Sequence, residues 1–219
     1  MIDTVIQSML STIAGINGKV EGAFNLRENG QGVERYSTEN IKIVPKKDKP
    51  GIDIFIRPGT KGEQVHIPVV LTQSGLNDLV YNDFFIGEGA DVTIIAGCGI
   101  HNDGCDTTEH DGIHSFKIGK DAHIRYVEKH YGEGTGTGER VLNPTTIVDM
   151  DEGSSCEMEM VQIAGVSSTI RKTEANLGAN AKLLITERLM THDDQRADSD
   201  VVIHLNGAGS SAQVISRSV

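Results

Sequence analysis

The residues best suited to chemistry in this chain are concentrated in one segment, GCGIHNDGCDTTEHDGIH at positions 97–114. It holds two of the three cysteines and three of the eight histidines: Cys98, His101, Cys105, His110 and His114. Thiolate and imidazole are ligands of zinc and ferrous iron, and an accessible thiolate can also accept sulfur. The spacing, C-x2-H-x3-C-x4-H-x3-H, is not that of a zinc finger. The segment is therefore a metal site, a sulfur-handling site or a polar connection between strands.

Three further residues, one cysteine and two histidines, could bind metal or react, but their surroundings in the sequence favour a structural or solvent-exposed position. Cys156 begins the alternating run CEMEM, in which Cys156 and the two methionines share one face and the glutamates share the other. This alternation predicts that Cys156 packs in the core, with a sulfur relay through the interior as the alternative. His192 and His204 lie at the edges of predicted strands, where we expect solvent contact rather than metal binding.

A glycine-rich stretch, GEGTGTG at 132–138, superficially resembles a phosphate-binding loop. No Lys-Ser or Lys-Thr pair follows it to open a helix, so the sequence does not predict a nucleotide site. We expect the surrounding segment, 131–144, to be one long flexible loop.

Hydrophobic periodicity predicts the elements that position these residues. Apolar residues recur at helical spacing over 2–14, and Gly15 and Gly18 follow. This predicts an amphipathic helix in an N-terminal unit, 1–19. From about residue 20 the period changes to two, with Gly, Asn and Asp between the apolar runs. Residues 20–219 are therefore predicted to form short strands joined by tight turns.

The strands carry a repeat. An aliphatic residue, two or three turn residues, a small residue and an alternating strand recur five times, beginning at positions 86, 118, 150, 177 and 205. A corner-and-strand unit with a period of about 30 residues predicts stacked turns whose equivalent strands run parallel. The predicted fold is all-β, a right-handed parallel β-helix with a short N-terminal helix. A β-sandwich would not share one corner motif, and left-handed β-helices repeat their hexapeptide without pause.

Composition narrows the classes of function. The net charge of −11 argues against nucleic-acid binding, because such a surface repels phosphate backbones. No apolar run approaches the roughly 18 residues needed to span a bilayer, and the start, MIDTVIQSML, lacks the basic region of a signal peptide. Three cysteines, an odd number, indicate free thiols in a reducing cytoplasm.

With these patterns in view, the chain resembles the SufB/SufD family of iron–sulfur cluster assembly scaffolds, in its short archaeal and bacterial form. The matching stretches include YSTENIKIV (36–44), AGCGIHN (96–102), HDGIH (110–114) and LNGAGSSAQVISRSV (205–219). The resemblance covers nearly the whole chain. Members of this family are right-handed parallel β-helices that hold a nascent iron–sulfur cluster for transfer to other proteins.

The resemblance implies a scaffold role rather than an enzyme. Cys98 matches the family cysteine implicated in sulfur acceptance, while His101, Cys105, His110 and His114 remain the candidate metal ligands from their side-chain chemistry. The implied cargo is a transient iron–sulfur cluster. The implied partners are a SufC-type ABC ATPase, a cysteine desulfurase or other sulfur donor, and a second SufB/SufD-like chain in a homo- or heterodimer.

The family pattern continues beyond the last residues of this chain. Family members add further turns and a C-terminal helical segment, which carry a cluster-building cysteine and the surface that docks the ATPase. This chain stops at Val219 without them, so a cluster held by this chain alone is not implied. Two alternatives stay open: a β-helical zinc metalloenzyme using His101, His110 and His114, and a structural module that self-associates through its last strand.

Overall fold

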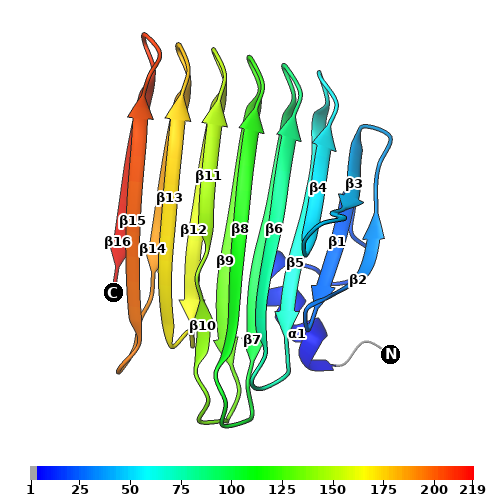
Figure 1. Cartoon of the computed structure of the whole chain (residues 1–219), viewed down its shortest axis with the longest axis vertical. Helices are drawn as coiled ribbons and strands as arrows, with labels where there is room; N and C mark the ends of the chain where they lie inside the picture. Colours follow the sequence, from blue (N-terminus) through cyan, green and yellow to red (C-terminus); the bar gives the residue numbers. More distant parts are fainter. Residues whose placement is uncertain (1–3) are drawn as a thin grey trace.

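The computed structural model describes residues 4–219 and is a right-handed parallel β-helix of about six turns (Figure 1). The predicted fold class is therefore confirmed. The predicted helix is present as α1 (Thr4–Ala14), whereas Ile2, its first predicted apolar position, lies outside the described residues. In the part of the chain that the structure describes, no helix has the length and apolarity needed to cross a membrane.

Sixteen strands follow α1, and together they form the solenoid. In chain order they are β1 (Ala23–Glu28), β2 (Gln31–Tyr36), β3 (Ile41–Pro45), β4 (Gly51–Ile56), β5 (Lys61–Leu71), β6 (Asn77–Ile86), β7 (Asp91–His101), β8 (Thr108–Ile118), β9 (His123–Glu133), β10 (Arg140–Leu142), β11 (Thr145–Met150), β12 (Ser155–Ala164), β13 (Ser168–Leu177), β14 (Lys182–Leu189), β15 (Arg196–Leu205) and β16 (Ser211–Ser218).

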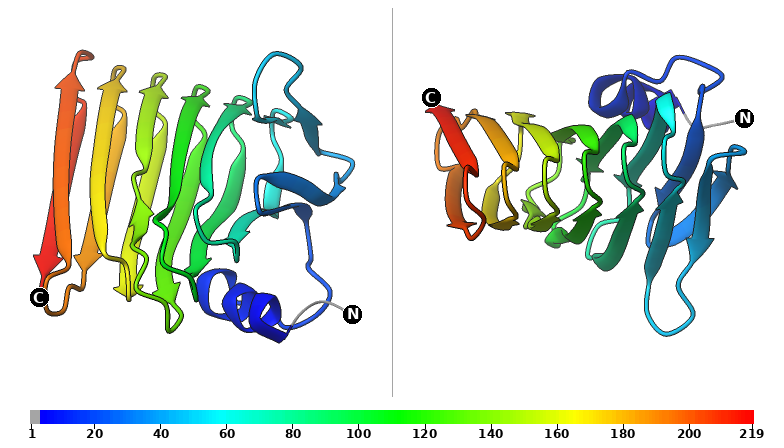
Figure 2. Two further views of the ribbon diagram at one scale, coloured as in Figure 1. Left: turned by 60° about the horizontal axis from the view of Figure 1, so that its bottom comes forward. Right: turned by 90° about the horizontal axis from the view of Figure 1, so that it is seen from above.

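Two sheets form the walls of the solenoid. Sheet A has the order β16-β14-β12-β9-β7-β5-β1-β2, and sheet B has the order β10-β13-β11-β8-β6-β4-β3, with β15 paired to β13. Consecutive strands such as β6 and β7 lie on opposite walls, so each turn contributes one strand to each sheet (Figure 2). The N-terminal turn departs from the parallel pattern, because β1 pairs with β2 and β3 pairs with β4 in antiparallel register.

The five positions that begin the sequence repeat lie in one row along the solenoid. In-register pairing joins Ile86, Ile118, Met150, Leu177 and Leu205 across successive strands of sheet B. The next inward row includes Phe84 and Phe116, whose rings stack with centroids 4.4 Å apart. The repeat is thus confirmed as one corner per turn. Its first four aliphatic positions are buried in the core near that corner, whereas Leu205 on the last turn is exposed.

The interior changes from apolar to polar away from the corner. In β8 the inward side chains run from Ile118 and Phe116 to His114, Gly112 and His110. The facing strand β9 shows the same change with distance from the corner. Its inward residues are aliphatic and aromatic at its start, near the corner, and acidic and imidazole side chains further along. The interior between β8 and β9 is therefore apolar near the corner and polar further from it, whereas the inward residues of β5 and β7 stay apolar along their length.

The helix α1 covers the outer face of sheet A directly behind β7 (Figure 2). Two glycines of β7 make this approach possible. A Cβ atom at Gly97 would lie 2.7 Å from the carbonyl oxygen of Ile13, and one at Gly99 would lie 2.5 Å from Cε of Met9. The alternation in AGCGIH therefore places Gly97 and Gly99 under the helix and Cys98 inside the solenoid.

Strands extend into two segments for which a loop was considered. The segment 97–114 consists of the end of β7, a turn at 102–107 and most of β8, so it is not a long polar insertion. The predicted loop 131–144 is shorter than expected, because residues 131–133 and 140–142 belong to β9 and β10, and its middle, 134–139, stacks on the preceding turn. Alternate glycines remove the side chains that would otherwise meet that backbone.

Candidate functional site

Cys98 lies inside the solenoid in a chain of polar contacts that crosses from sheet A to sheet B. Its side chain is 4% exposed and hydrogen-bonds to His110, which faces it from β8. Nδ1 of His110 lies 3.1 Å from Oδ2 of Asp78 in β6. Asp78 also accepts three hydrogen bonds from Arg27 of β1, one of them 2.9 Å from Nε. A thiol, an imidazole, a carboxylate and a guanidinium are therefore connected in one buried row.

The charge state of this row follows from its contacts. Burial would lower the pKa of His110, but the negative charges of Cys98 and Asp78 outweigh burial and raise the pKa to about 10. Burial would raise the pKa of Asp78, but hydrogen bonds from Arg27 and His110 hold it well below its usual range. His110 is thus an imidazolium at neutral pH. An imidazolium that hydrogen-bonds a cysteine sulfur stabilises negative charge on that sulfur. The negatively charged thiolate is the form of cysteine that reacts.

A small cavity adjoins Cys98, and we refer to it as the inner cavity. Its volume is about 20 Å³, and its polar wall consists of Cys98, His110, His114, Glu128 and His130. Gly112 provides the space, since a Cβ there would lie 3.1 Å from Nε2 of His114 and 3.3 Å from Nε2 of His110. A space of this size holds about one water molecule. It therefore accommodates one additional atom on the sulfur of Cys98 but not the four heavy atoms of even the smallest iron–sulfur cluster.

A second buried network closes the inner cavity on the C-terminal side. Tyr126 donates a 3.0 Å hydrogen bond to Glu128, and Nδ1 of His114 lies 2.7 Å from the Tyr126 hydroxyl. Arg171, with a fully buried side chain, forms an ion pair with Glu128 and lies 3.9 Å from Glu187. Such a group of buried charges is costly to desolvate and is stable only when each charge has a partner.

The two other histidines of the inner cavity are neutral. Burial lowers the pKa of His114 to about 4 and the pKa of His130 to about 3, although the charge of Glu128 opposes this in both cases. Burial would raise the pKa of Glu128, but Arg171 and the neighbouring imidazoles hold it far below its usual range. The inner cavity thus offers one cationic imidazole beside the sulfur and two neutral imidazoles that can accept or donate a hydrogen bond.

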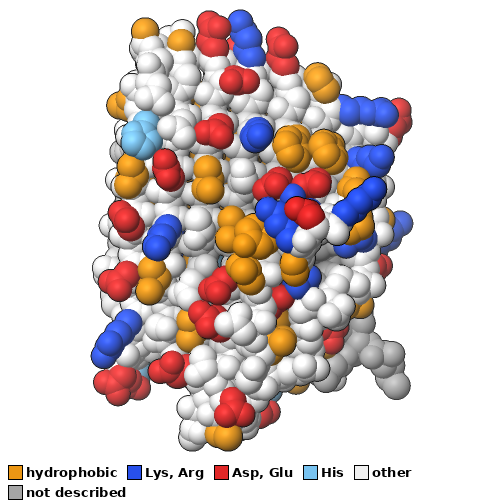
Figure 3. All heavy atoms as spheres, in the orientation of Figure 1, with side chains coloured by type: hydrophobic (Ala, Val, Ile, Leu, Met, Phe, Trp, Pro, Cys, Tyr) orange, Lys and Arg blue, Asp and Glu red, His pale blue; other side chains and the backbone are white. Residues whose placement is uncertain are grey.

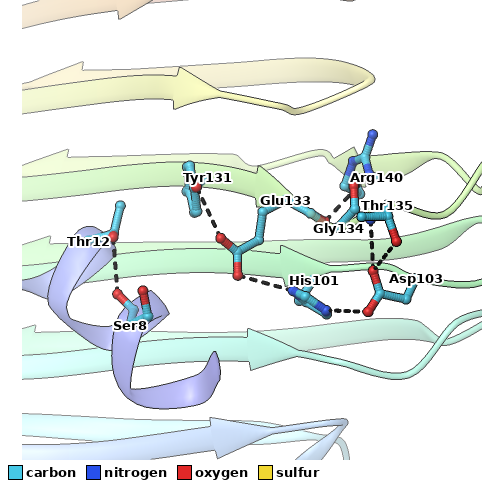
Figure 4. A network of polar contacts seen from close by, with 9 residues as sticks. All are labelled: Ser8, Thr12, His101, Asp103, Tyr131, Glu133, Gly134, Thr135 and Arg140. Carbon is cyan, nitrogen blue, oxygen red and sulfur yellow. Dashed lines mark hydrogen bonds and ion pairs between the residues drawn. The ribbon is translucent and has the colours of Figure 1, made fainter. Parts of the chain in front are cut away.

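His101 lies apart from this interior site. It is 20% exposed at the end of β7, where Nε2 lies 2.9 Å from Asp103 and Nδ1 lies 3.1 Å from Glu133 (Figure 4). Asp103 in turn accepts a 2.7 Å hydrogen bond from the backbone N–H of Thr135. Burial would lower the pKa of His101, but the two carboxylates raise it. His101 therefore joins two stacked turns.

The remaining sequence candidates also lie away from Cys98. Cys105 is exposed in the turn 102–107, and His192 and His204 are exposed and paired with nearby carboxylates, as expected for solvated residues. Cys156 is 1% exposed, and burial raises the pKa of its thiol to about 12. Its predicted place in the core is confirmed.

The structure brings together only part of the predicted ligand set. His110 and His114 converge with Cys98, but His101 and Cys105 do not, so the zinc site predicted from His101, His110 and His114 does not form. Among residues 4–219, no group of three or more His, Cys, Asp or Glu side chains is arranged to hold a metal ion.

Sequence patterns missed the polar residues contributed by other turns. Glu128 and His130 occupy the inward positions of an alternating strand that begins with Ile124 and Tyr126. Arg171 has the same inward phase as the buried residues of β13. These residues could have been found from the sequence, because a charged residue at an inward position of an alternating strand indicates a buried polar site.

Comparison with known proteins found neither a matching family profile nor a matching curated protein.

Proposed function

We propose that this protein is a scaffold of SUF-type iron–sulfur cluster assembly, in which Cys98 accepts sulfur. The observation that carries the proposal is the position of Cys98, which hydrogen-bonds to the His110 imidazolium and adjoins the inner cavity. This arrangement supplies a cationic imidazole beside the sulfur and space for one added sulfur atom. The resemblance of AGCGIHN and HDGIH to the SufB/SufD family supports the same assignment.

The reaction we propose is a transfer of sulfane sulfur. The Cys98 thiolate attacks the terminal sulfur of a donor persulfide, R–S–SH, and forms a new S–S bond. The S–S bond of the donor breaks, and the donor leaves as the thiolate R–S⁻. Cys98 becomes a persulfide, and no external oxidant or reductant is required. His110 stays protonated and stabilises the charge on the attacking sulfur.

The cluster is cargo in this proposal rather than a resident cofactor. Because the inner cavity has room for about one atom, the cluster would be held elsewhere, in a dimer of SufB/SufD-like chains or with the partner ATPase. The protein would then act as a non-catalytic scaffold in the reducing cytoplasm, where Cys98 remains a free thiol.

Sulfur loading and cluster reconstitution test this function. The purified chain would be treated anaerobically with a persulfide donor, and the thiols would be alkylated and identified by mass spectrometry. A second sample would be reconstituted with iron and sulfide and assayed for iron, zinc and acid-labile sulfide per chain. We expect a mass increase of one sulfur atom at Cys98, lost in Cys98→Ser.

Cys156→Ser is the matched control, because Cys156 is an equally buried thiol whose pKa is raised by burial. It should leave loading at Cys98 unchanged. Equal loading of the wild type and Cys98→Ser would refute sulfur acceptance at Cys98. Zinc bound without labile sulfide, and lost in His110→Gln, would instead support a metal site at the inner cavity.

A further inference from the structure

A second, larger cavity lies at the N-terminal end of the solenoid, and we refer to it as the N-terminal cavity. Its volume is about 340 Å³, and it lies between the turn that joins β1 to β2 and the turn that joins β3 to β4. This is within the range of small-molecule sites in proteins. Two of its lining residues, Ile67 and Val69, also line the inner cavity. Ile67 and Val69 therefore border both cavities.

The lining of the N-terminal cavity is basic although the chain as a whole carries a net charge of −11. Among the described residues it includes four cationic side chains and no carboxylate: Arg27, Arg35, Lys46 and Lys49. Lys and Arg side chains gather over this end of the molecule, around β2 to β4 (Figure 3). A concave site of one charge sign raises the local concentration of oppositely charged ligands.

Two of these four cations are neutralised by carboxylates that lie behind the lining. Arg27 pairs with Asp78, and Lys46 pairs with Asp53 and Asp83. Arg35 and Lys49 are available, since Arg35 donates from Nε to the amide oxygen of Asn25 and Lys49 lies over the ring of Tyr81. Neither has a carboxylate ion-pair partner among residues 4–219. Because Lys46 pairs with two carboxylates, these four cations and three carboxylates leave one net positive charge, and the unpaired cations are Arg35 and Lys49.

The floor of the N-terminal cavity is connected electrostatically to Cys98. Arg27 lines the cavity and binds Asp78, and Asp78 binds the His110 imidazolium beside the sulfur. These three groups together carry one net positive charge next to the sulfur of Cys98. Cationic groups therefore lie at both ends of this region, Arg35 and Lys49 in the lining of the N-terminal cavity and His110 beside the sulfur.

We propose that the N-terminal cavity binds small anions that carry sulfane sulfur and is the route by which they reach Cys98. The ligand class comprises inorganic polysulfide and the persulfides of low-mass anionic thiols. The proposal rests on the proposed role of Cys98 as a sulfur acceptor, and it makes a small molecule rather than a protein side chain the immediate donor. With polysulfide, Cys98 takes one sulfur atom, and the donor leaves as the polysulfide shortened by one sulfur.

Charged thiol reagents test the route independently of sulfur chemistry. In a Cys105→Ser background, which removes the exposed thiol, Cys98 would be reacted with three methanethiosulfonates. One reagent is neutral (methyl), one anionic (sulfonatoethyl) and one cationic (trimethylammonioethyl). Rates measured by mass spectrometry would be divided by those with a free small thiol. We expect the anionic reagent to react at least about 10-fold faster than the cationic one, and less so at high salt.

The deciding variant is Arg35→Gln combined with Lys49→Gln. It should lower the ratio of anionic to cationic rates to near one and leave the rate with the neutral reagent unchanged. Lys120→Gln combined with Arg125→Gln removes the same charge from exposed residues of other turns and should keep the wild-type ratio. An equal fall in both double variants, or no reaction of Cys98 with any reagent, would overturn the proposed route.

Sulfur loading with sodium tetrasulfide and with glutathione persulfide separates this proposal from the function on which it rests. The two donors distinguish an inorganic from an organic source. Slower loading of Cys98 in the Arg35→Gln, Lys49→Gln variant supports the route. Loading at the wild-type rate in that variant overturns the route but leaves Cys98 as an acceptor. Preferential reaction with the anionic reagent but no sulfur uptake from either donor supports the anion site and refutes sulfur acceptance.

Discussion

Cys98 and His110 contact each other inside the solenoid although they belong to opposite walls, Cys98 to sheet A and His110 to sheet B. The turn 102–107 reverses the chain between their strands, so both residues come from one short stretch of sequence. Their hydrogen bond forms within the polar half of the interior, where Asp78 of the preceding turn fixes the imidazole.

The first prediction concerns the protonation of His110. The folded-state pKa of His110, about 10, lies above its ordinary value of 6.5, so its protonation contributes stability that is fully present below pH 6.5. That contribution is lost as the pH rises towards 10. NMR titration of the His110 ring, assigned with His110→Gln, should show an imidazolium at pH 8. Cys98→Ser should lower the midpoint, because the charge of Cys98 is the largest cause that raises it; an unchanged midpoint would contradict this assignment.

The second prediction concerns the space left by Gly112. In Gly112→Ala the new methyl group meets both Nε2 atoms that border the inner cavity. We expect sulfur loading at Cys98 to fall about 10-fold or more, because small displacements of reacting groups are costly, and the free energy of unfolding to fall by about 1 kcal/mol. Persulfide mass spectrometry and urea unfolding measure the two effects. Ala175→Val overpacks sheet B away from the cavity and should lower stability while leaving the loading intact.

The third prediction concerns the buried charges around Arg171. Arg171→Met leaves Glu128 and Glu187 without their cation, and we expect the free energy of unfolding to fall by about 3–5 kcal/mol. Glu128→Leu and Glu187→Leu added to this variant should restore most of the loss, because a buried ionic group can be replaced by packed apolar residues. Urea unfolding of the single and triple variants gives the comparison. Equal instability of the two would show that packing rather than charge explains the loss.

The fourth prediction concerns the packing of α1 against β7. Gly97→Ala places a methyl group against the carbonyl oxygen of Ile13, whereas Gly99→Ala places one against the flexible end of Met9. We expect Gly97→Ala to lower the free energy of unfolding by about 1–3 kcal/mol and to expose α1 to proteolysis. Gly99→Ala should cost less than about 1 kcal/mol, since a methionine side chain can move. The reverse order would mean that helix and sheet do not approach as closely as described.

The fold could be predicted from the sequence because each copy of the repeat marks one corner of a turn, and equivalent corners stack on one another. Ile86, Ile118 and Met150 begin equivalent corners, and pairing of equivalent strands follows from their equal spacing. The β1–β2 and β3–β4 hairpins were not predicted as such, because alternation alone does not distinguish an antiparallel pair from two parallel strands.

The site was predicted only where the sequence places its members close together. Cys98, His110 and His114 belong to one segment, and strand alternation turns all three inward. Asp78 and Arg171 reach the same interior from other turns, and only the register between strands shows which residues they meet. The prediction placed His101 in the same metal site as His110 and His114. The side chain of His101 instead has the outward phase of its strand and lies beside Glu133.

The stacked turns at 102–107 and 134–139 have a consequence for evolutionary change. Gly136 and Gly138 donate backbone hydrogen bonds to Asn102 and Gly104, so the two turns follow the same path, one above the other. An insertion in one of them alone would leave unpaired backbone groups on its neighbour. Among homologues of this chain, insertions and deletions in the turns 102–107 and 134–139 should therefore occur together, about one turn of the solenoid apart.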